Sequence, residues 1–424
     1  MKFKRCWKPI KMNLENSLYK VRPLKKFDKE IILPTSKSHS NRALILGAIR
    51  GGNFKVHNLS TSTDVTHLLN AFKKIGLRIR QNGSTVIFEN SFPECEKESS
   101  GDVIELMTGD GGTTNRFLIA LLARGKKEYH LRPSEKMNER PIEDLLAPLK
   151  KISVNIVCNQ DKNNPEAWIK MKGPASLYNT TKLEVDCSKS TQFASALMLA
   201  FSNIPLKFEF LNLKSSEAYL KMTSQVIKKA TEGNSYTIPV DFSSLGYPAA
   251  LAALMGRVLI KNCLEIDSLQ ADSSFIELLK EIGAHRVLSN DGLEIKKGSA
   301  LKAFSFDVSK APDLFPTLVF LAAHIEGEST FSKLEVLQFK ESDRLLEMVK
   351  MMKSFGVEFI HSPENDSMTI KGSAKTYPEV TIQPVRDHRI VMAAALFMWK
   401  NSGGMLGEVD CIEKSFPNFL SLLE

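Results

Sequence analysis

Basic side chains stand beside hydroxyls and glycines at several points of the chain, an arrangement typical of anion-binding sites. The densest group is the run PTSKSHSNR at residues 34–42, in which Lys37 offers a point charge and Arg42 a bidentate fork. Hydroxyls and free N–H groups at a helix start would complete a cradle for an anion. Gly111 and Gly112, shortly before Arg116, would let the backbone approach a ligand closely. Either group alone would also fit an ordinary capped helix or turn.

Three further cations occur near expected helix starts. Arg140 precedes Pro141, and proline favours the first helical position, so we expect a helix to begin there. Arg140 is then either a ligand for a phosphate or carboxylate or a solvated loop residue. Lys340 and Arg344 are four residues apart, so on a helix they would share one face and could clasp one anion. A solvated helix turn is the default interpretation of such a run.

Charged residues also stand at the entrance of the most apolar helix expected in the chain. The run RDHR at residues 386–389 brings three potential cations to this point, which is costly without an anionic partner, so we favour a binding role. Asp313 stands at another apolar helix start, where it is either a cap or a carboxylate whose raised pKa suits proton transfer. Lys414 places one more cation before a short helix.

One pattern recurs six times and must position these residues: small or polar residues, followed by an Ala/Leu-rich helix. The copies begin at Thr35, Gly109, Asp186, Asp241, Asp307 and Val385. The helices are apolar nearly all round, which predicts that they are buried. Amphipathic helices are expected after most copies, at residues 64–75, 142–151, 274–282 and 341–355. Three of these end at a glycine followed by a strand-like run, so the units predict mixed α/β layers.

Six units suggest two domains of three units each. A break near Pro239 and Val240 separates the third unit from the fourth. We therefore expect one domain over residues 35–240, and a second domain that combines residues 1–34 with residues 241–424.

Composition excludes several classes of protein. The formal charge of +9 fits anionic partners, but the basic residues are dispersed and form no RNA-binding motif, so a small anionic molecule is favoured over nucleic acid. The longest apolar run, residues 390–399, is too short for the ~20 residues of a membrane span. The six cysteines lie far apart and have no zinc-ligand spacing, so we expect reduced thiols in a cytoplasmic protein.

Taken in order, these motifs resemble the EPSP synthase family of enolpyruvyl transferases, over about residues 31–423. The resemblance implies a two-domain inside-out α/β barrel (α+β) of six βαβαββ units, three per domain, with the active site in the interdomain cleft. It implies transfer of the enolpyruvyl group of phosphoenolpyruvate to the 5-hydroxyl of shikimate 3-phosphate, on the shikimate pathway to chorismate and the aromatic amino acids. Addition at C2 would accompany protonation of the methylene carbon, and the tetrahedral intermediate would lose phosphate.

The resemblance also implies roles for individual residues. Those expected to bind phosphoenolpyruvate are Lys37, Gly112, Arg140, Gln192, Arg344, Arg389 and Lys414. Those expected to bind shikimate 3-phosphate are Ser38, Arg42, Ser190, Thr191, Gln192, Ser216, Tyr219, Asp313 and Lys340. The expected catalytic residues are Lys37, Asp313, Glu341 and Lys414, with Asp313 and Glu341 as acid/base carboxylates. The chain departs from the usual pattern at Phe117, Thr191 and Val336, where the family often has Pro, Ser and Asn.

The resemblance leads to further expectations about partners. We expect no metal or organic cofactor, no nucleic-acid or membrane partner, a monomer, and competition between glyphosate and phosphoenolpyruvate. One alternative is the sister family, UDP-N-acetylglucosamine enolpyruvyl transferase, but its usual Lys-Asn pair is Lys37-Ser38 here and its mobile-loop cysteine is missing between Gly111 and Glu139. A basic nucleic-acid-binding repeat protein is a second alternative, which leaves the ordered motifs without a role.

Overall fold

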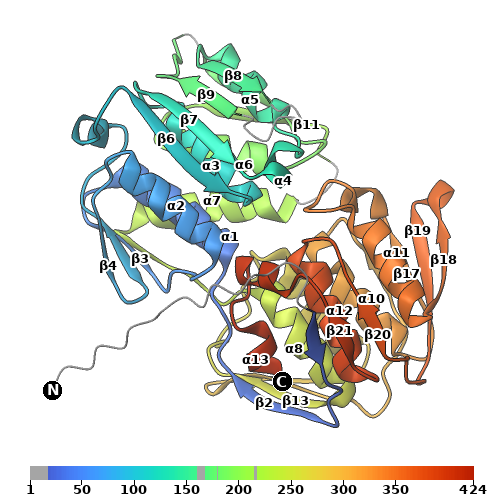
Figure 1. The fold of residues 1–424 in the computed structure, drawn as a ribbon. Helices are drawn as coiled ribbons and strands as arrows, with labels where there is room; N and C mark the ends of the chain where they lie inside the picture. Colours follow the sequence, from blue (N-terminus) through green and yellow to red (C-terminus); the bar gives the residue numbers. More distant parts are fainter. Residues whose placement is uncertain (1–17, 160–167, 179, 214–216) are drawn as a thin grey trace.

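The structure is a computed structural model of the 424-residue chain and describes residues 18–159, 168–178, 180–213 and 217–424. Helices and strands alternate along the chain and form two halves, one blue to green and the other mostly yellow to red (Figure 1). A strand from the N-terminal end, β2, lies in the second half beside β13.

Six buried helices form the centres of the two halves, as the repeated apolar pattern predicted. In the first half, α1, α3 and α6 pack against one another, and in the second half α8, α10 and α12 do so. Most residues of these helices are buried, on all faces of each helix. Their bounds are α1 Lys37–Arg50, α3 Gly112–Leu122, α6 Gln192–Ala200, α8 Phe242–Met255, α10 Phe315–Ala323 and α12 His388–Lys400.

Three sheets of the first half lie around its buried helices. Two have four strands, in the orders β12-β3-β5-β4 and β6-β7-β9-β8, and the third pairs β10 with β11 in parallel. The bounds are β3 Phe54–His57, β4 Ile79–Asn82, β5 Thr85–Phe88, β6 Val103–Gly109, β7 Glu128–Pro133, β8 Asn155–Asn159, β9 Trp168–Lys172, β10 Lys182–Asp186, β11 Lys207–Leu211 and β12 Ser235–Thr237.

The second half also has three sheets. Their orders are β14-β15-β13-β2, β16-β17-β19-β18 and β1-β21-β20. Two strands from the start of the chain, β1 and β2, therefore complete sheets whose other members follow residue 240. The bounds are β1 Tyr19–Val21, β2 Phe27–Ile31, β13 Gly256–Ile260, β14 His285–Ser289, β15 Gly292–Lys296, β16 Ser305–Asp307, β17 Gly327–Ser332, β18 Glu358–Ser362, β19 Ser367–Gly372, β20 Val380–Ile382 and β21 Gly404–Leu406.

Shorter and amphipathic helices cover the sheets and link the strands. The α-helices are α2 Thr63–Lys74, α4 Glu135–Asn138, α5 Glu143–Lys151, α7 Glu217–Glu232, α9 Ser274–Glu281, α11 Arg344–Phe355 and α13 Phe419–Leu423. The 3-10 helices are η1 Glu94–Glu98, η2 Ala271–Ser273, η3 Pro312–Leu314, η4 Leu334–Leu337, η5 Pro363–Asn365 and η6 Val409–Lys414. Gly76, Gly283 and Gly356 follow α2, α9 and α11 with φ angles of 96°, 103° and 74°, as expected of helix-ending glycines.

Two expected helix starts were wrong by a few residues. The helix expected from residue 341 begins at Arg344, because Asp343 caps it by accepting a hydrogen bond from the Leu346 N–H at 3.0 Å. Lys340 therefore precedes the helix and does not share a helical face with Arg344. The helix expected to begin at Pro141 begins at Glu143, so the proline lies just outside it.

Two segments cross side by side between the halves. Thr35 and Val240 form an antiparallel bridge, the Ser36 N–H donates to the Pro239 carbonyl, and the Asp241 N–H donates to the Pro34 carbonyl. One cluster of buried apolar residues spans residues 43–238, and another combines residues 21–33 with residues 240–423. These clusters support the expected domain division, which stays a prediction. No helix within the described ranges combines the length and the apolar character of a membrane span.

Candidate active site

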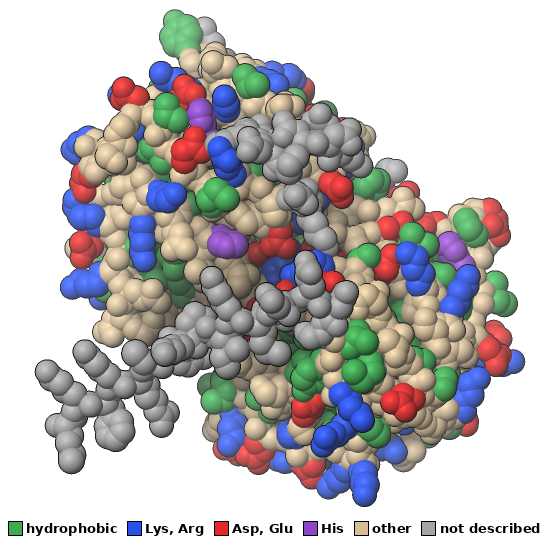
Figure 2. All heavy atoms as spheres, in the orientation of Figure 1, with side chains coloured by type: hydrophobic (Ala, Val, Ile, Leu, Met, Phe, Trp, Pro, Cys, Tyr) green, Lys and Arg blue, Asp and Glu red, His purple; other side chains and the backbone are tan. Residues whose placement is uncertain are grey.

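A cavity of about 430 Å3 lies between the two halves and brings most of the predicted site residues together. Figure 2 shows acidic and basic side chains in the hollow between the halves. The predicted residues that line it are Lys37, Ser38, Arg42, Gly112, Arg140, Ser190, Thr191, Gln192, Tyr219, Asp313, Lys340, Glu341, Arg344 and Arg389. Lys414 is not part of the lining but contacts Glu341, and Ser216 lies outside the described residues.

The ends of helices from both halves position these side chains. Lys37, Gly112 and Gln192 are the first residues of α1, α3 and α6, and all three line the cavity. Arg344 and His388, which begin α11 and α12, line it from the other half. Because each helix N-terminus carries free N–H groups and a partial positive charge, their convergence favours anionic ligands.

Arg42 is a buried cation, and among the described residues no carboxylate accepts a hydrogen bond from it. Its Nε donates to the Thr223 hydroxyl at 2.8 Å and one terminal nitrogen donates to the Ser38 carbonyl at 2.9 Å. Its guanidinium lies over the rings of Phe117 and Tyr219, 5.3 and 5.9 Å from their centroids. Burial lowers the pKa of Arg42 to about 10, and an anion bound beside it would stabilise the charge.

Lys37 is held by a carboxylate that sequence reasoning missed. Its Nζ lies 2.9 Å from the Asp64 carboxylate, and the Asp64 side chain is only 2% exposed. Asp64 stands in the first turn of α2, a favourable place for an acidic residue. Its place near a helix start could have indicated this role in the sequence, because a buried carboxylate needs a cationic partner.

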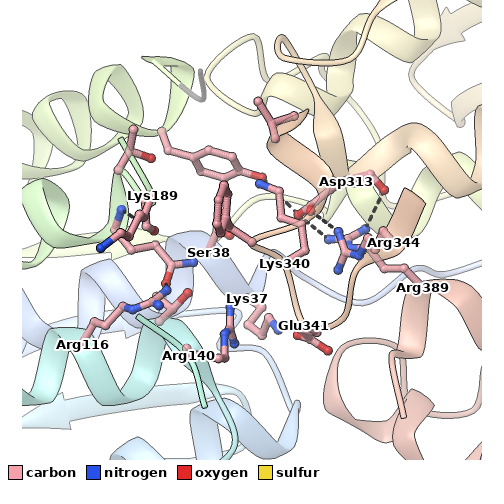
Figure 3. Close-up of a pocket in the computed structure, with 18 of the residues that line it drawn as sticks. Lys37, Ser38, Arg116, Arg140, Lys189, Asp313, Lys340, Glu341, Arg344 and Arg389 are labelled. Atoms are coloured by element: carbon pink, nitrogen blue, oxygen red, sulfur yellow. Dashed lines mark hydrogen bonds and ion pairs between the residues drawn. The ribbon is translucent and has the colours of Figure 1, made fainter. Parts of the chain in front are cut away.

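Asp313 joins two guanidinium groups in the second half of the molecule. Its carboxylate lies 2.6 Å from Arg344 and 2.8 Å from Arg389, and it accepts a hydrogen bond of 3.4 Å from the Tyr219 hydroxyl (Figure 3). Burial favours the protonated form, but Arg389, Arg344 and Lys340 outweigh it and lower the pKa of Asp313 well below its usual value. The expectation of a raised pKa is therefore wrong, because the surroundings of this carboxylate are cationic rather than apolar.

Glu341 belongs to a second buried cluster of charges. Its carboxylate lies 2.9 Å from His388 Nδ1 and 3.1 Å from Lys414 Nζ. Burial opposes ionisation, yet His388 and Lys414 together lower the pKa of Glu341 well below its usual value. Glu341, Asp387 and His388 are close enough to share a metal ion, but Lys414 and Arg344 already pair with the two carboxylates.

The sequence profile described as EPSP synthase (3-phosphoshikimate 1-carboxyvinyltransferase) matches residues 21–423 of the chain. The chain belongs to the EPSP synthase family. The predicted family, enzyme class and enolpyruvyl-transfer reaction are thereby confirmed.

Similar proteins agree with this membership. A 3-phosphoshikimate 1-carboxyvinyltransferase of Syntrophobacter fumaroxidans is 28% identical, over 95% of this chain and 98% of that protein. One of Haemophilus ducreyi is 29% identical, over 96% and 98%. The solved structure of an EPSP synthase from Acinetobacter baumannii has a TM-score of 0.74 at 22% identity, covering 96% of this chain and 97% of that chain. The enolpyruvyl transferase NikO from Streptomyces tendae has a TM-score of 0.66 at 12% identity, covering 96% of each. These two structures confirm the fold class.

Arg116, which lines the cavity, and Asp387, which is buried behind Arg344, were assigned no role by the resemblance to the EPSP synthase family. Arg116 is buried, and its guanidinium donates to the Gln192 amide oxygen at 2.7 Å and to the Pro141 carbonyl at 2.8 Å. It therefore fixes the side chain of Gln192. Asp387 accepts a hydrogen bond of 2.9 Å from Arg344 Nε and orients that guanidinium toward Asp313. Arg116 follows the Gly111-Gly112 pair and Asp387 lies in the run RDHR at residues 386–389. Their place in these motifs could have indicated that they belong to the site.

Two departures from the usual family pattern lie at the site. Phe117 is fully buried under the Arg42 guanidinium, so the larger ring serves as a platform for that cation. Val336 lines the cavity and offers no hydrogen-bond donor or acceptor in its side chain.

Proposed function

We propose that this cavity binds shikimate 3-phosphate and phosphoenolpyruvate side by side and carries the enolpyruvyl transfer of the EPSP synthase family. The observation that carries the proposal is the convergence of helix starts, lysines and arginines from both halves on one cavity. The two substrates bring two phosphates and two carboxylates, and such a dense set of cations needs anionic partners. Ser38, in place of the asparagine usual in the sister family, favours shikimate 3-phosphate over UDP-N-acetylglucosamine as the acceptor.

The shikimate 3-phosphate site is proposed to lie mainly between α1, α6 and α7. Arg42, Ser38 and Tyr219 come from one side, and Lys340 comes from the other. Ser190 and Thr191 present hydroxyls at the start of α6. Ser216 remains a proposed contact on the family resemblance alone. The support for this site is Arg42, whose buried charge has no carboxylate hydrogen-bond partner in the part of the chain that the structure describes.

The phosphoenolpyruvate site is proposed to include two groups of residues. Arg344, Arg389 and Lys414 come from the second half, while Lys37, Gly112, Arg140 and Gln192 come from the first. Arg344 and Arg389 pair with Asp313, Lys37 pairs with Asp64, and Lys414 pairs with Glu341. Binding of the substrate would add its carboxylate and phosphate to these existing clusters.

Two ionised carboxylates are proposed to handle the protons. Asp313 accepts the proton of the 5-hydroxyl as its oxygen attacks C2 of phosphoenolpyruvate. The cluster of Glu341, His388 and Lys414 delivers a proton, carried by the Lys414 ammonium, to the methylene carbon, and Lys37 stabilises the developing charge. In the elimination step that cluster removes one of the three hydrogens of the newly formed methyl group, and the phosphate leaves with the proton that Asp313 holds. All protons are then restored and only the enolpyruvyl group has moved.

A phosphate-release assay with two acceptors tests the proposal. The purified chain is incubated with phosphoenolpyruvate and either shikimate 3-phosphate or UDP-N-acetylglucosamine. We expect phosphate release with shikimate 3-phosphate alone, and loss of that release in Arg42→Met. Release with UDP-N-acetylglucosamine instead would assign the chain to the sister activity, and release with neither acceptor would overturn the proposal.

We also propose that the chain acts as a monomer in the cytoplasm. Residues of both halves of a single chain line the cavity, so the site needs no contribution from a second copy. The five cysteines in the described part of the chain are free thiols, which fits a reducing compartment.

A further inference from the structure

Lys189 is a cation at the cavity for which neither the family motifs nor the proposed mechanism provides a role. It lies in the loop that leads into α6, between Ser188 and Ser190, and all three residues line the cavity. Figure 3 shows Lys189 near Arg116, at the end of the cavity away from Asp313, Arg344 and Arg389. Its Nζ lies 3.4 Å from the carboxylate of Asp144, in the first turn of α5.

We propose that Lys189 is a specificity-determining residue that contacts the phosphate group of shikimate 3-phosphate, and that Asp144 competes with this phosphate for its ammonium. This inference rests on the proposed function, because it needs the phosphorylated acceptor beside α6. It adds a charged contact to a subsite whose other expected ligands at this helix, Ser190 and Thr191, are neutral hydroxyls.

The position of Lys189 in the cavity favours contact with the phosphate of shikimate 3-phosphate over contact with phosphoenolpyruvate. Of the three arginines proposed for phosphoenolpyruvate, Arg344 and Arg389 stand at the opposite end of the cavity, and Arg140 lies between them and Lys189 in this view (Figure 3). The loop before α6 presents the hydroxyls of Ser188, Ser190 and Thr191 together with the free N–H groups of the helix start. A phosphate bound there would accept from hydroxyls and N–H groups, and Lys189 would supply the opposite charge.

The contact between Lys189 and Asp144 is weak enough to be exchanged. The Lys189 side chain is 45% exposed and the Asp144 side chain is 21% exposed, so solvent screens their attraction. A phosphate monoester carries close to two negative charges near neutral pH, whereas a carboxylate carries one. The ammonium therefore favours the phosphate when both are in reach, and Asp144 competes with the substrate for it.

A solvated surface ion pair is the competing interpretation of Lys189, and a control lysine separates the two. Lys182 on β10 is 52% exposed and pairs with Glu209, but it does not line the cavity. Lys189→Met and Lys182→Met remove the same charge from the same half of the molecule. Only the first variant should affect the acceptor.

The test is steady-state kinetics of the full chain with shikimate 3-phosphate and phosphoenolpyruvate. In Lys189→Met we expect the KM for shikimate 3-phosphate to rise about tenfold, the size of one lost charge-assisted contact, while the KM for phosphoenolpyruvate stays within twofold. Lys182→Met should match the wild type. Asp144→Asn, which removes the competitor, should lower the KM for shikimate 3-phosphate, and it should have no effect when Lys189 is already Met.

The outcomes distinguish this inference from the proposed function. A wild-type chain active with shikimate 3-phosphate, together with a Lys189→Met variant that matches Lys182→Met, would overturn the role of Lys189 alone. A rise in both KM values would show a general loss of positive charge and would overturn the claimed specificity. A wild-type chain inactive with shikimate 3-phosphate would overturn the proposed function itself. Circular dichroism melting of each variant excludes misfolding as the cause of a raised KM.

Discussion

Lys414 connects the two halves of the molecule through Asp110. The Lys414 ammonium lies 3.1 Å from the carboxylate of Asp110, which precedes α3 in the first half, and 3.1 Å from the carboxylate of Glu341 in the second half. A proposed catalytic lysine therefore stands where the halves meet. The Asp110 side chain is 39% exposed, so this contact is worth at most about 1 kcal/mol.

Because that contact is weak, we expect substrate to determine how tightly the halves close. Arg140 on one side of the cavity repels Lys340 on the other, and an anion bound between them would relieve this repulsion. Shikimate 3-phosphate should therefore reduce the radius of gyration measured by small-angle X-ray scattering. Shikimate without the phosphate, at the same concentration, is the control and should compact the chain less. An unchanged radius of gyration at saturating shikimate 3-phosphate would contradict this expectation.

Lys37→Ala should nearly abolish turnover. Loss of one preorganised donor to a developing charge costs about 2.7–4 kcal/mol, or roughly 10²–10³ in kcat. The substitution also leaves the buried Asp64 carboxylate unpaired, so some loss of thermal stability is expected as well. The double variant Lys37→Ala/Asp64→Asn should recover the melting temperature without recovering activity. A single variant within tenfold of the wild-type kcat at saturating substrates would exclude the proposed role.

The affinity for shikimate 3-phosphate should fall as the pH rises above about 8. Burial lowers the pKa of Lys340 to about 8, so its ammonium is charged below that pH and neutral above it. Between pH 7 and pH 9 the KM for shikimate 3-phosphate should rise about tenfold if only the charged form binds. Lys340→Arg keeps its charge throughout this range and should flatten the profile. The same steep rise in Lys340→Arg would show that another group titrates.

Glyphosate should compete with phosphoenolpyruvate, and Gly112 should influence the two ligands unequally. A Cβ atom added at Gly112 would lie 2.6 Å from a terminal nitrogen of Arg140, so Gly112→Ala must displace that guanidinium. Glyphosate has a longer backbone between its two anionic groups than phosphoenolpyruvate and tolerates such a shift less well. We expect its inhibition constant to rise more than the KM for phosphoenolpyruvate. Equal increases, or inhibition that is not competitive, would place the inhibitor elsewhere.

The sequence predicted the six buried helices, and it predicted that the binding motifs lie at the starts of helices. The six helices that are apolar all round could be recognised because burial on every side leaves no polar stripe. Lys37, Gly112 and Gln192 were expected at helix starts, and each begins its helix in the structure. The family resemblance, rather than local pattern, brought these distant segments into one expected cleft.

The charge partners within the site could not be predicted from the sequence. The neighbours of Asp313 in the sequence are apolar residues. Only the folded chain shows that Arg344 and Arg389, from two other elements, flank its carboxylate. The sign of its pKa shift depends on those tertiary contacts, so reasoning from its sequence neighbours failed. Asp64 was missed for the same reason, because its partner Lys37 is 27 residues away in the sequence.

The most direct test of the account is proton NMR of the product formed in D2O. The wild-type chain is incubated with shikimate 3-phosphate and phosphoenolpyruvate, and released phosphate is measured in parallel. We predict an enolpyruvyl ether at the 5-oxygen, one phosphate for each ether, and deuterium in its vinyl methylene group, because the addition step delivers a solvent-exchanged proton to that carbon. No vinyl ether, or an ether whose methylene carries no deuterium, would contradict transfer by addition and elimination at this site.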